Sequence, residues 1–249
     1  MKIAQVFYVS LISVAMHTSS IYAKGESSFS AGLVYVSSGL VYSNAISKSR
    51  LMPSLSYEGE NLNVSLQEGA SYKILNGASS SFSISIAPNF KPYDRSDFVN
   101  LNGMKRNMYF DGSALVSYKI DRGLTAKFKY SMELTNEFNG NAADVSLSQF
   151  IPVAGIPVIV TAGSKWYDSN LSEFLYGVYF AETTSLRSQY APGNVFVPYL
   201  NLNTFYKITD SVGIFAAMIT NFLPAKVKNS PVVRDKNATS FVFGLGYKF

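Results

Sequence analysis

Large apolar side chains alternate with small or polar ones along much of this chain, most clearly near residue 249. Five apolar residues occupy every second position there: Phe241, Phe243, Leu245, Tyr247 and Phe249. Ser, Gly and Lys fill most of the positions between them. Because successive side chains of a strand point to opposite faces, this pattern predicts a β-strand with one apolar face over 239–249.

The same period of two recurs along the chain. Between 124 and 135, apolar residues take one parity, and Lys127, Lys129 and Glu133 take the other. Patterns of this kind predict twelve strands, at 28–36, 51–57, 61–75, 80–90, 107–120, 123–135, 142–152, 156–167, 173–182, 195–208, 211–223 and 239–249.

Strands of about 9–11 residues with one apolar face are typical of a transmembrane β-barrel, whereas a membrane helix needs about 18 consecutive apolar residues. Hydrophobic residues make up 47% of the chain and charged residues 15%, but no segment after residue 23 holds such a run. We therefore predict an all-β protein, a transmembrane antiparallel up-and-down barrel whose apolar face meets outer-membrane lipid. Closure gives every backbone polar group a partner within the sheet. The last strand would be the segment that the barrel-assembly machinery inserts.

The predicted strand number is ten to twelve, because the connections conflict with one another. Short connections of a bacterial barrel lie at its periplasmic end and long ones outside. Residues 121–123, 153–155 and 209–210 are all short connections, yet the twelve ranges cannot place all three at one end. Either one short turn lies outside, or part of 168–195 does not cross the membrane. The longer connections, at 37–50, 91–106, 183–194 and 224–238, are polar and are expected to be loops.

Charged side chains on the predicted strands should face the lumen, since a Lys facing hydrocarbon costs about 2–4 kcal/mol at the bilayer midplane. The predicted lumen-facing charges are Lys119, Lys127, Lys129, Glu133 and Lys248. They could select ions in a pore, or they could form an internal lattice of ion pairs that fills a narrow barrel. Aromatic residues near strand ends are expected to form interfacial girdles, with a stacking platform for sugar as the alternative: Tyr93, Tyr109, Trp166, Tyr167, Tyr190 and Tyr199.

Residue types exclude several kinds of chemistry. The chain has no Cys, and its only His is His17, in the segment assigned below to a leader. Thiolate metal sites, disulfides and His-assisted nucleophiles are then excluded from the mature chain. No cofactor motif is present, so we expect a protein that is not an enzyme and holds no cofactor. A carboxylate-only calcium site near Asp94 and Asp97 is conceivable, but solvated loop acids explain them more simply. Although the net charge is +5, no dense basic run suggests nucleic-acid binding.

The first 23 residues have the features of a secretory signal peptide. Lys2 supplies a positive start, a mostly apolar stretch follows to Met16, and Ala23 offers the small residue expected before a cleavage site. We expect cleavage between Ala23 and Lys24, which leaves 24–249 as the outer-membrane barrel domain. The apolar stretch is too short and interrupted for an anchor helix.

Several short motifs resemble the MltA-interacting protein (MipA)/OmpV family of outer-membrane proteins. They are LNGMKR at 101–106, WYDSNL at 166–171, YGV at 176–178, LRSQYAP at 186–192, VPYL at 197–200, NSPVV at 229–233 and GYKF at 246–249. The resemblance covers most of the chain from 24 on and is strongest after about 144. One departure is Asn229, where the family usually has Asp before Ser-Pro, so any role of that acid does not carry over.

The resemblance implies a barrel in the cell outer membrane of a Gram-negative bacterium. It further implies a scaffold that joins a lytic transglycosylase to a peptidoglycan synthase, since that is the role of the best-known members. A small porin-like channel and a surface adhesin are the alternatives that the family offers. No partner-contacting residue of the family can be placed on this sequence.

Overall fold

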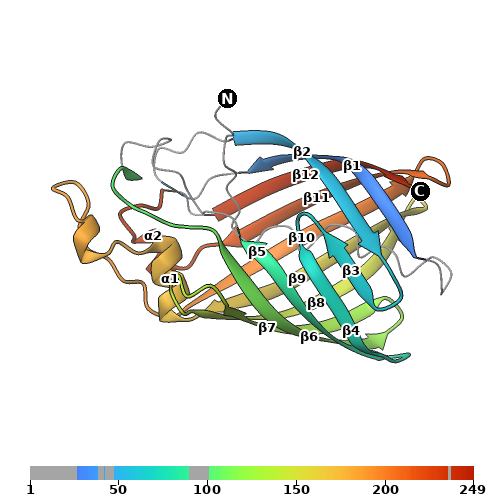
Figure 1. Cartoon of the computed structure of the whole chain (residues 1–249), viewed down its shortest axis with the longest axis horizontal. Coiled ribbons are helices and arrows are strands. Elements are labelled where there is room, and N and C mark those ends of the chain that lie inside the picture. Colours follow the sequence, from blue (N-terminus) through green and yellow to red (C-terminus); the bar gives the residue numbers. More distant parts are fainter. Residues whose placement is uncertain (1–26, 39–41, 43–47, 90–100, 235–236) are drawn as a thin grey trace.

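The computed structural model describes residues 27–38, 42, 48–89, 101–234 and 237–249. Its strands form one closed antiparallel barrel, in which each strand pairs with its neighbours along the chain and β1 pairs with β12 (Figure 1). The strands are β1 (Ser28–Ser38), β2 (Lys48–Glu58), β3 (Leu62–Ser65), β4 (Gly69–Asn76), β5 (Ser80–Asn89), β6 (Tyr109–Asp121), β7 (Leu124–Glu133), β8 (Asn141–Val153), β9 (Ile156–Tyr167), β10 (Val195–Lys207), β11 (Val212–Phe222) and β12 (Asn237–Lys248). The predicted fold class, with twelve strands, is confirmed.

Two of the predicted strands are wrong. The range 173–182 is not a strand: it holds the end of helix α1 (Ser169–Tyr176) and the 3-10 helix η4 (Phe180–Glu182). The range 61–75 is two strands, because Gly69, at φ 75°, turns the chain between β3 and β4. Gln67 in this turn donates a 2.8 Å hydrogen bond to the carbonyl oxygen of Pro53 on β2.

Removing 173–182 as a crossing resolves the conflict between the connections. Residues 122–123, 154–155 and 208–211 now all lie at one end of the barrel, together with Ser28 and Phe249. The long connections lie at the opposite end, where α1 and α2 (Ala225–Lys228) are found, on the left in Figure 1. We call these the turn end and the outer end. The rule that short turns face the periplasm assigns the turn end to that side.

The strands have one exposed apolar face and one inner face. On β12, Phe241, Phe243 and Leu245 are 43–51% exposed, whereas Val242 between them is 3% exposed. The same alternation runs through β1, where Leu33 and Tyr35 are exposed and Val34 is buried. The exposed set forms the band that hydrocarbon covers, so the buried set lines the bore. In the part of the chain that the structure describes, no helix is both long and apolar enough to cross a membrane.

Candidate functional site

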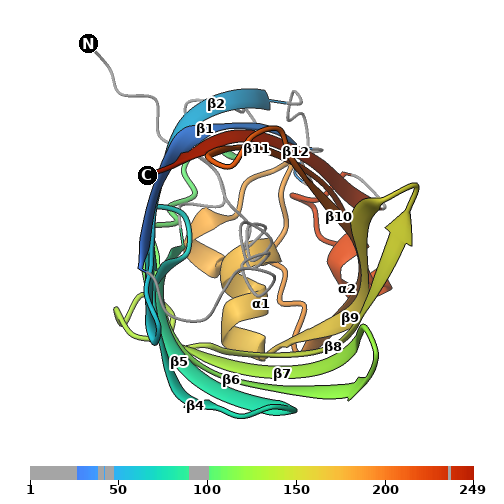
Figure 2. The same ribbon diagram turned by 90° about the vertical axis from the view of Figure 1, so that its right-hand side faces the viewer.

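Three connections meet at the outer end and close the mouth of the barrel. They are residues 101–108 between β5 and β6, 168–194 between β9 and β10, and 223–234 between β11 and β12. Viewed from the turn end, α1 lies across the bore behind the ring of strands (Figure 2). We call these three connections, together with Tyr42, the cap.

Helix α1 begins where the sequence supplies an N-terminal cap. The Asp168 carboxylate accepts a 2.8 Å hydrogen bond from the Leu171 N–H, which satisfies one of the free donors of the first turn. Its other oxygen accepts the backbone N–H of Asn141 on β8, also at 2.8 Å. Leu171, Phe174 and Leu175 recur at helical spacing and are buried. Asp168 therefore starts the helix and fixes it to the barrel wall.

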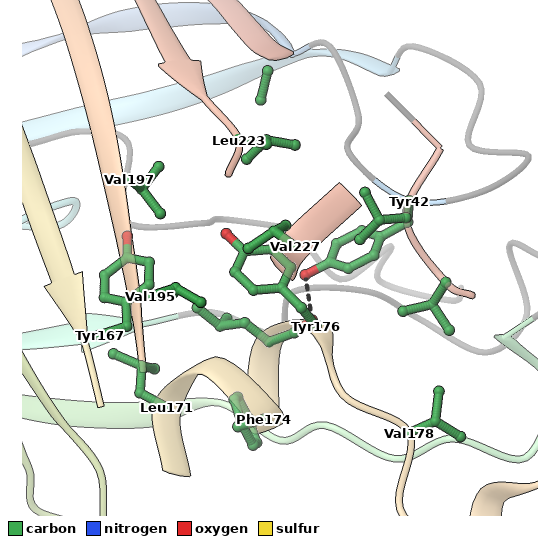
Figure 3. Close-up of a cluster of buried hydrophobic side chains, with 14 of the residues drawn as sticks. Tyr42, Tyr167, Leu171, Phe174, Tyr176, Val178, Val195, Val197, Leu223 and Val227 are labelled. Atoms are coloured by element: carbon green, nitrogen blue, oxygen red, sulfur yellow. Dashed lines mark hydrogen bonds between the residues drawn. The ribbon is translucent and has the colours of Figure 1, made fainter. Parts of the chain in front are cut away.

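A hydrophobic core fills the mouth beneath the loops (Figure 3). Its members come from all parts of the cap and from the ends of β6, β9, β10 and β12: Tyr42, Leu101, Met104, Tyr109, Tyr167, Leu171, Phe174, Leu175, Tyr176, Val178, Val195, Val197, Leu223, Val227, Val232, Val233 and Ala238. The Tyr42 hydroxyl donates a 3.0 Å hydrogen bond to the carbonyl oxygen of Leu175. Since each large buried side chain stabilises by roughly 1.5–3 kcal/mol, the cap is a packed part of the fold.

Arg106 joins two of the cap's connections. Its side chain is fully buried and forms a bidentate ion pair with Glu182, at 2.5 and 3.1 Å. Its Nε donates to the carbonyl oxygen of Phe174 at 2.6 Å, and its guanidinium lies 4.5 Å from the centroid of the Tyr179 ring. A planar guanidinium with five donors suits this combination of carboxylate, carbonyl and aromatic partners.

The Glu182 carboxylate is held in its charged form. Burial alone would raise the pKa of Glu182, but hydrogen bonds from Arg106 and from the Tyr179 N–H, with the Arg106 charge, lower it below its ordinary value. Other polar groups of the cap bond to carbonyl oxygens. Arg187 Nε donates to Glu182 O at 2.9 Å, and the Ser230 hydroxyl donates to Tyr176 O at 2.6 Å. The carbonyl oxygens of Glu182 and Tyr176 thus have side-chain partners.

Below the cap, the bore becomes more exposed toward the turn end. On β10, inward-facing Val197 and Tyr199 are buried, whereas Asn201 and Asn203 are half-buried. On β12, Val242 is buried and Gly244 and Gly246 are half-buried. Beside β12, inward-facing residues of β1 and β11 form a second buried apolar cluster: Val34, Val36, Ala217, Ile219 and Val242. Inward-facing side chains are therefore more exposed near the turn end than beneath the cap.

The structure separates the five predicted lumen charges. Lys127 and Lys129 are half-buried on the inner face of β7, next to Ser131, which is 9% exposed. Lys119 and Lys248 are exposed at the turn end. Glu133 lies at the outer end of β7, where its carboxylate accepts backbone N–H groups from the β7–β8 loop, including Asn139 at 3.0 Å.

Sequence reasoning missed the charged residues that lie next to Lys129. In the strand register, Asp144 on β8 lies directly between Lys129 on β7 and Lys165 on β9. Tyr199 donates a 2.9 Å hydrogen bond to Asp144, and the Lys165 ammonium lies 5.3 Å from the centroid of the Tyr199 ring. Parity within each strand was the available signal: it places Asp144 and Lys165 on the inner face but does not set which residues lie side by side.

The predicted aromatic girdle is wrong at three positions. Tyr109, Tyr167 and Tyr199 are 5–7% exposed and point inward, because each shares the parity of the bore-facing residues of its strand. Tyr190 belongs to the cap, where its hydroxyl donates to Lys226 O at 2.6 Å. Trp166 has the parity of the lipid face and is half-buried.

Some predicted positions lie outside the described residues. They are the leader at 1–23, the cleavage site Ala23–Lys24, Tyr93, and the acids Asp94 and Asp97. Among the residues that the structure does describe, no group of three or more His, Cys, Asp or Glu could hold a metal ion.

Comparison with known proteins identifies a family and several relatives of this chain. The family model described as MltA-interacting protein MipA matches residues 29–249. The putative outer membrane protein YiaT of Escherichia coli K12 is 25% identical over 233 residues, which cover 90% of this chain and 91% of that protein. The outer membrane protein Omp26La of Vibrio anguillarum is 24% identical over 184 residues, 73% of this chain and 71% of that one.

Among solved structures, the toluene transporter TodX of Pseudomonas putida aligns with 98% of this chain and 94% of its own, with 11% identity and a TM-score of 0.44. The curated relatives are described as outer membrane proteins, which confirms the predicted location. The motifs that carried the family resemblance at 101–106, 166–171, 186–192 and 229–233 all include residues of the cap. The chain therefore belongs to the MltA-interacting protein (MipA) family and is a β-barrel of the outer membrane.

Proposed function

We propose that this protein is a non-catalytic scaffold that holds murein-processing enzymes at the periplasmic face of the outer membrane. A lytic transglycosylase is the first expected partner, because the family is named for interaction with MltA. A peptidoglycan synthase is the second. The observation that carries this proposal is the packed cap: a barrel whose outer mouth is closed by a hydrophobic core suits a static body better than an open pore.

The turn end supplies a suitable docking surface. Its connections are short, so the surface is a rigid ring rather than a set of mobile loops. Charged side chains of both signs are exposed on it: Lys119, Asp121, Arg122, Lys207, Asp210 and Lys248. Such a rim would select a partner by electrostatic complementarity.

The test is recovery of partners from a periplasmic extract on the purified, detergent-solubilised barrel. We expect the wild-type barrel to retain a lytic transglycosylase and a peptidoglycan synthase. The turn-end double variant Lys119→Ala/Arg122→Ala should retain less of both enzymes. The difference from the wild type should become smaller as salt is raised, because salt screens the attraction that these two cations provide in the wild type.

The matched control is Lys105→Ala/Lys228→Ala, which removes two exposed cations from the outer end instead. It should retain both enzymes at the wild-type level. Recovery of neither enzyme on the wild-type barrel would refute the scaffold role. Equal losses in the two double variants would refute its assignment to the turn end.

A small channel is the second candidate, and the polar inner face of β7–β10 favours it. Lys127, Ser148, Thr161 and Asn201 lie on this face. A channel that opens only when the cap moves should show rare conductance steps in a planar bilayer, and these should become frequent in Arg106→Ala. Silence from both the wild type and this variant would exclude a pore.

A further inference from the structure

Two aromatic rings of the bore lie against glycines of the neighbouring strand. Phe215 on β11 occupies the space that a Cβ on Gly244 of β12 would need, with ring atoms 1.9–2.6 Å from that position. In the same way, Phe205 on β10 occupies the space that a Cβ on Gly213 of β11 would need, with its nearest ring atoms 2.5 and 2.6 Å from that position. Phe205 and Phe215 are also direct cross-strand partners. The glycines therefore let two large rings lie along the wall, half-buried, instead of across the bore.

Polar groups with unused hydrogen-bonding capacity stand next to this aromatic pair. Asn201 and Asn203 precede Phe205 on the inner face of β10. Within the described part of the chain, both carboxamide oxygens are buried and neither has a hydrogen-bond partner. Asn201 lies beside Thr161 of β9, whose hydroxyl bonds to that of Ser148 at 2.8 Å. Buried polar groups are normally hydrogen-bonded, so these two carboxamides lack a partner that a ligand of the bore could supply.

Charge in this part of the bore is mixed rather than of one sign. Lys127 and Lys129 stand on β7, and neither ammonium forms an ion pair or hydrogen bond with another described residue. Asp144 is the register neighbour of Lys129, and the negative charge of Glu68 also attracts both lysines. A simple anion would thus meet carboxylates as well as ammonium groups. A neutral, hydroxyl-rich ligand can bond to both.

We propose that the turn-end half of the bore is a binding site for a short saccharide that enters from the periplasmic side. A sugar has apolar C–H faces, which fit the half-buried rings of Phe205 and Phe215, and hydroxyl groups, which fit the carboxamides of Asn201 and Asn203. Inward-facing residues of β10 and β12 are more exposed toward the turn end than beneath the packed cap, so this ligand would enter from the turn end. This site goes beyond the scaffold role, which needs only the outside of the turn end.

Calorimetric titration of the full-length mature barrel with maltotriose and with the trimer of N-acetylglucosamine tests the site. The detergent must carry no sugar headgroup, because a maltoside would compete. We expect saturable binding of at least one of the two probes, with a dissociation constant on the order of 1 mM or tighter. Asn201→Ala/Asn203→Ala should bind about ten-fold more weakly, the effect of losing two hydrogen bonds.

Phe215→Leu keeps an apolar side chain but removes the flat face, and it should also weaken binding about ten-fold. The matched control Asn102→Ala changes an exposed Asn on the outer side of the cap and should bind as the wild type does. Absence of binding by both probes, or unchanged affinity in either bore variant, overturns the proposal. Retention of the murein enzymes by the same variants separates this result from the scaffold test.

Discussion

At the scale of single residues, Arg106 has several partners in the cap, and its position shows why. It is fully buried between residues 101–108 and 168–194, and its guanidinium donates to Glu182 as well as to three backbone carbonyl oxygens. Removing one partner of a buried ion pair leaves the other charge unpaired, which costs about 3–5 kcal/mol. Arg106→Ala should lower the free energy of unfolding by about this amount, measured by urea titration in lipid vesicles.

The neighbouring Lys105 provides the control for this prediction, because it is exposed. Lys105→Ala should change the free energy of unfolding by less than about 0.5 kcal/mol. A wild-type unfolding curve for Arg106→Ala would show that the ion pair does not stabilise the cap.

Glu182 makes the stability of the cap depend on pH in a defined direction. Its pKa in the folded protein lies below the ordinary value of 4.5, so the unfolded chain binds its proton more readily. The stabilisation is therefore complete above about pH 4.5 and is lost as the pH falls through the folded pKa. Proteolysis of the 168–194 connection should accelerate over that acidic range in the wild type.

In Glu182→Gln this acid-induced change should be much smaller, because the titrating group is gone. The variant should be cleaved faster than the wild type at neutral pH, and the two rates should converge in acid. Parallel pH profiles for the two proteins would show that another group controls the cap.

Single residues also show what alternation in the sequence can reveal. Lys127 and Lys129 are placed on the inner face by parity alone, since charge avoids hydrocarbon. Tyr109, Tyr167 and Tyr199 follow the same rule, but their position near strand ends suggested a girdle instead. Asp144 could not be paired with Lys129 from the sequence, because pairing depends on the register between strands, and a period of two does not set the register.

The start of helix α1 depends on the side chain of Asp168. Asp168 accepts hydrogen bonds from Leu171 N and Asn141 N, so it serves the helix and β8 together. Asp168→Ala should destabilise the cap by about 1–2 kcal/mol, the usual cost of losing an N-cap. Amide hydrogen exchange should then become faster in residues 169–176 than in β9.

Asp168→Asn tests the cause, since its carboxamide oxygen can still cap the helix but offers only one acceptor oxygen. We expect intermediate exchange rates in this variant. The exposed neighbour substitution Ser169→Ala should leave exchange in α1 unchanged. Equal protection of α1 in Asp168→Ala and the wild type would mean that packing alone holds the helix.

The elements could be predicted unequally well from the sequence. Long strands such as β7, β9 and β12 repeat a period of two over ten residues or more, and their ranges were close to those observed. Helix α1 has only eight residues, too few for a helical period to dominate. The Asp168 cap and the spacing of Leu171, Phe174 and Leu175 were nevertheless present as signals. The cap core could not be foreseen, because it joins connections far apart in the sequence.

At the scale of the whole molecule, sidedness and closure are the central claims. The short turns, the start of β1 and the end of β12 lie at one end of the barrel, and the packed cap lies at the other. The chain contains no Cys, so single cysteines can report which side of the membrane each end faces. Leu186, in the cap, is 91% exposed, and the side chain of Asp210, in a short turn, is 99% exposed.

Labelling of Leu186→Cys and Asp210→Cys with a maleimide too large for general porins is the most direct measurement. Intact cells should label Leu186→Cys at once and leave Asp210→Cys unlabelled, and rupture of the outer membrane should make Asp210→Cys reactive. Labelling of Asp210→Cys in intact cells, with Leu186→Cys protected, would contradict the orientation. Labelling of neither variant until the inner membrane is broken would contradict the location of the barrel itself.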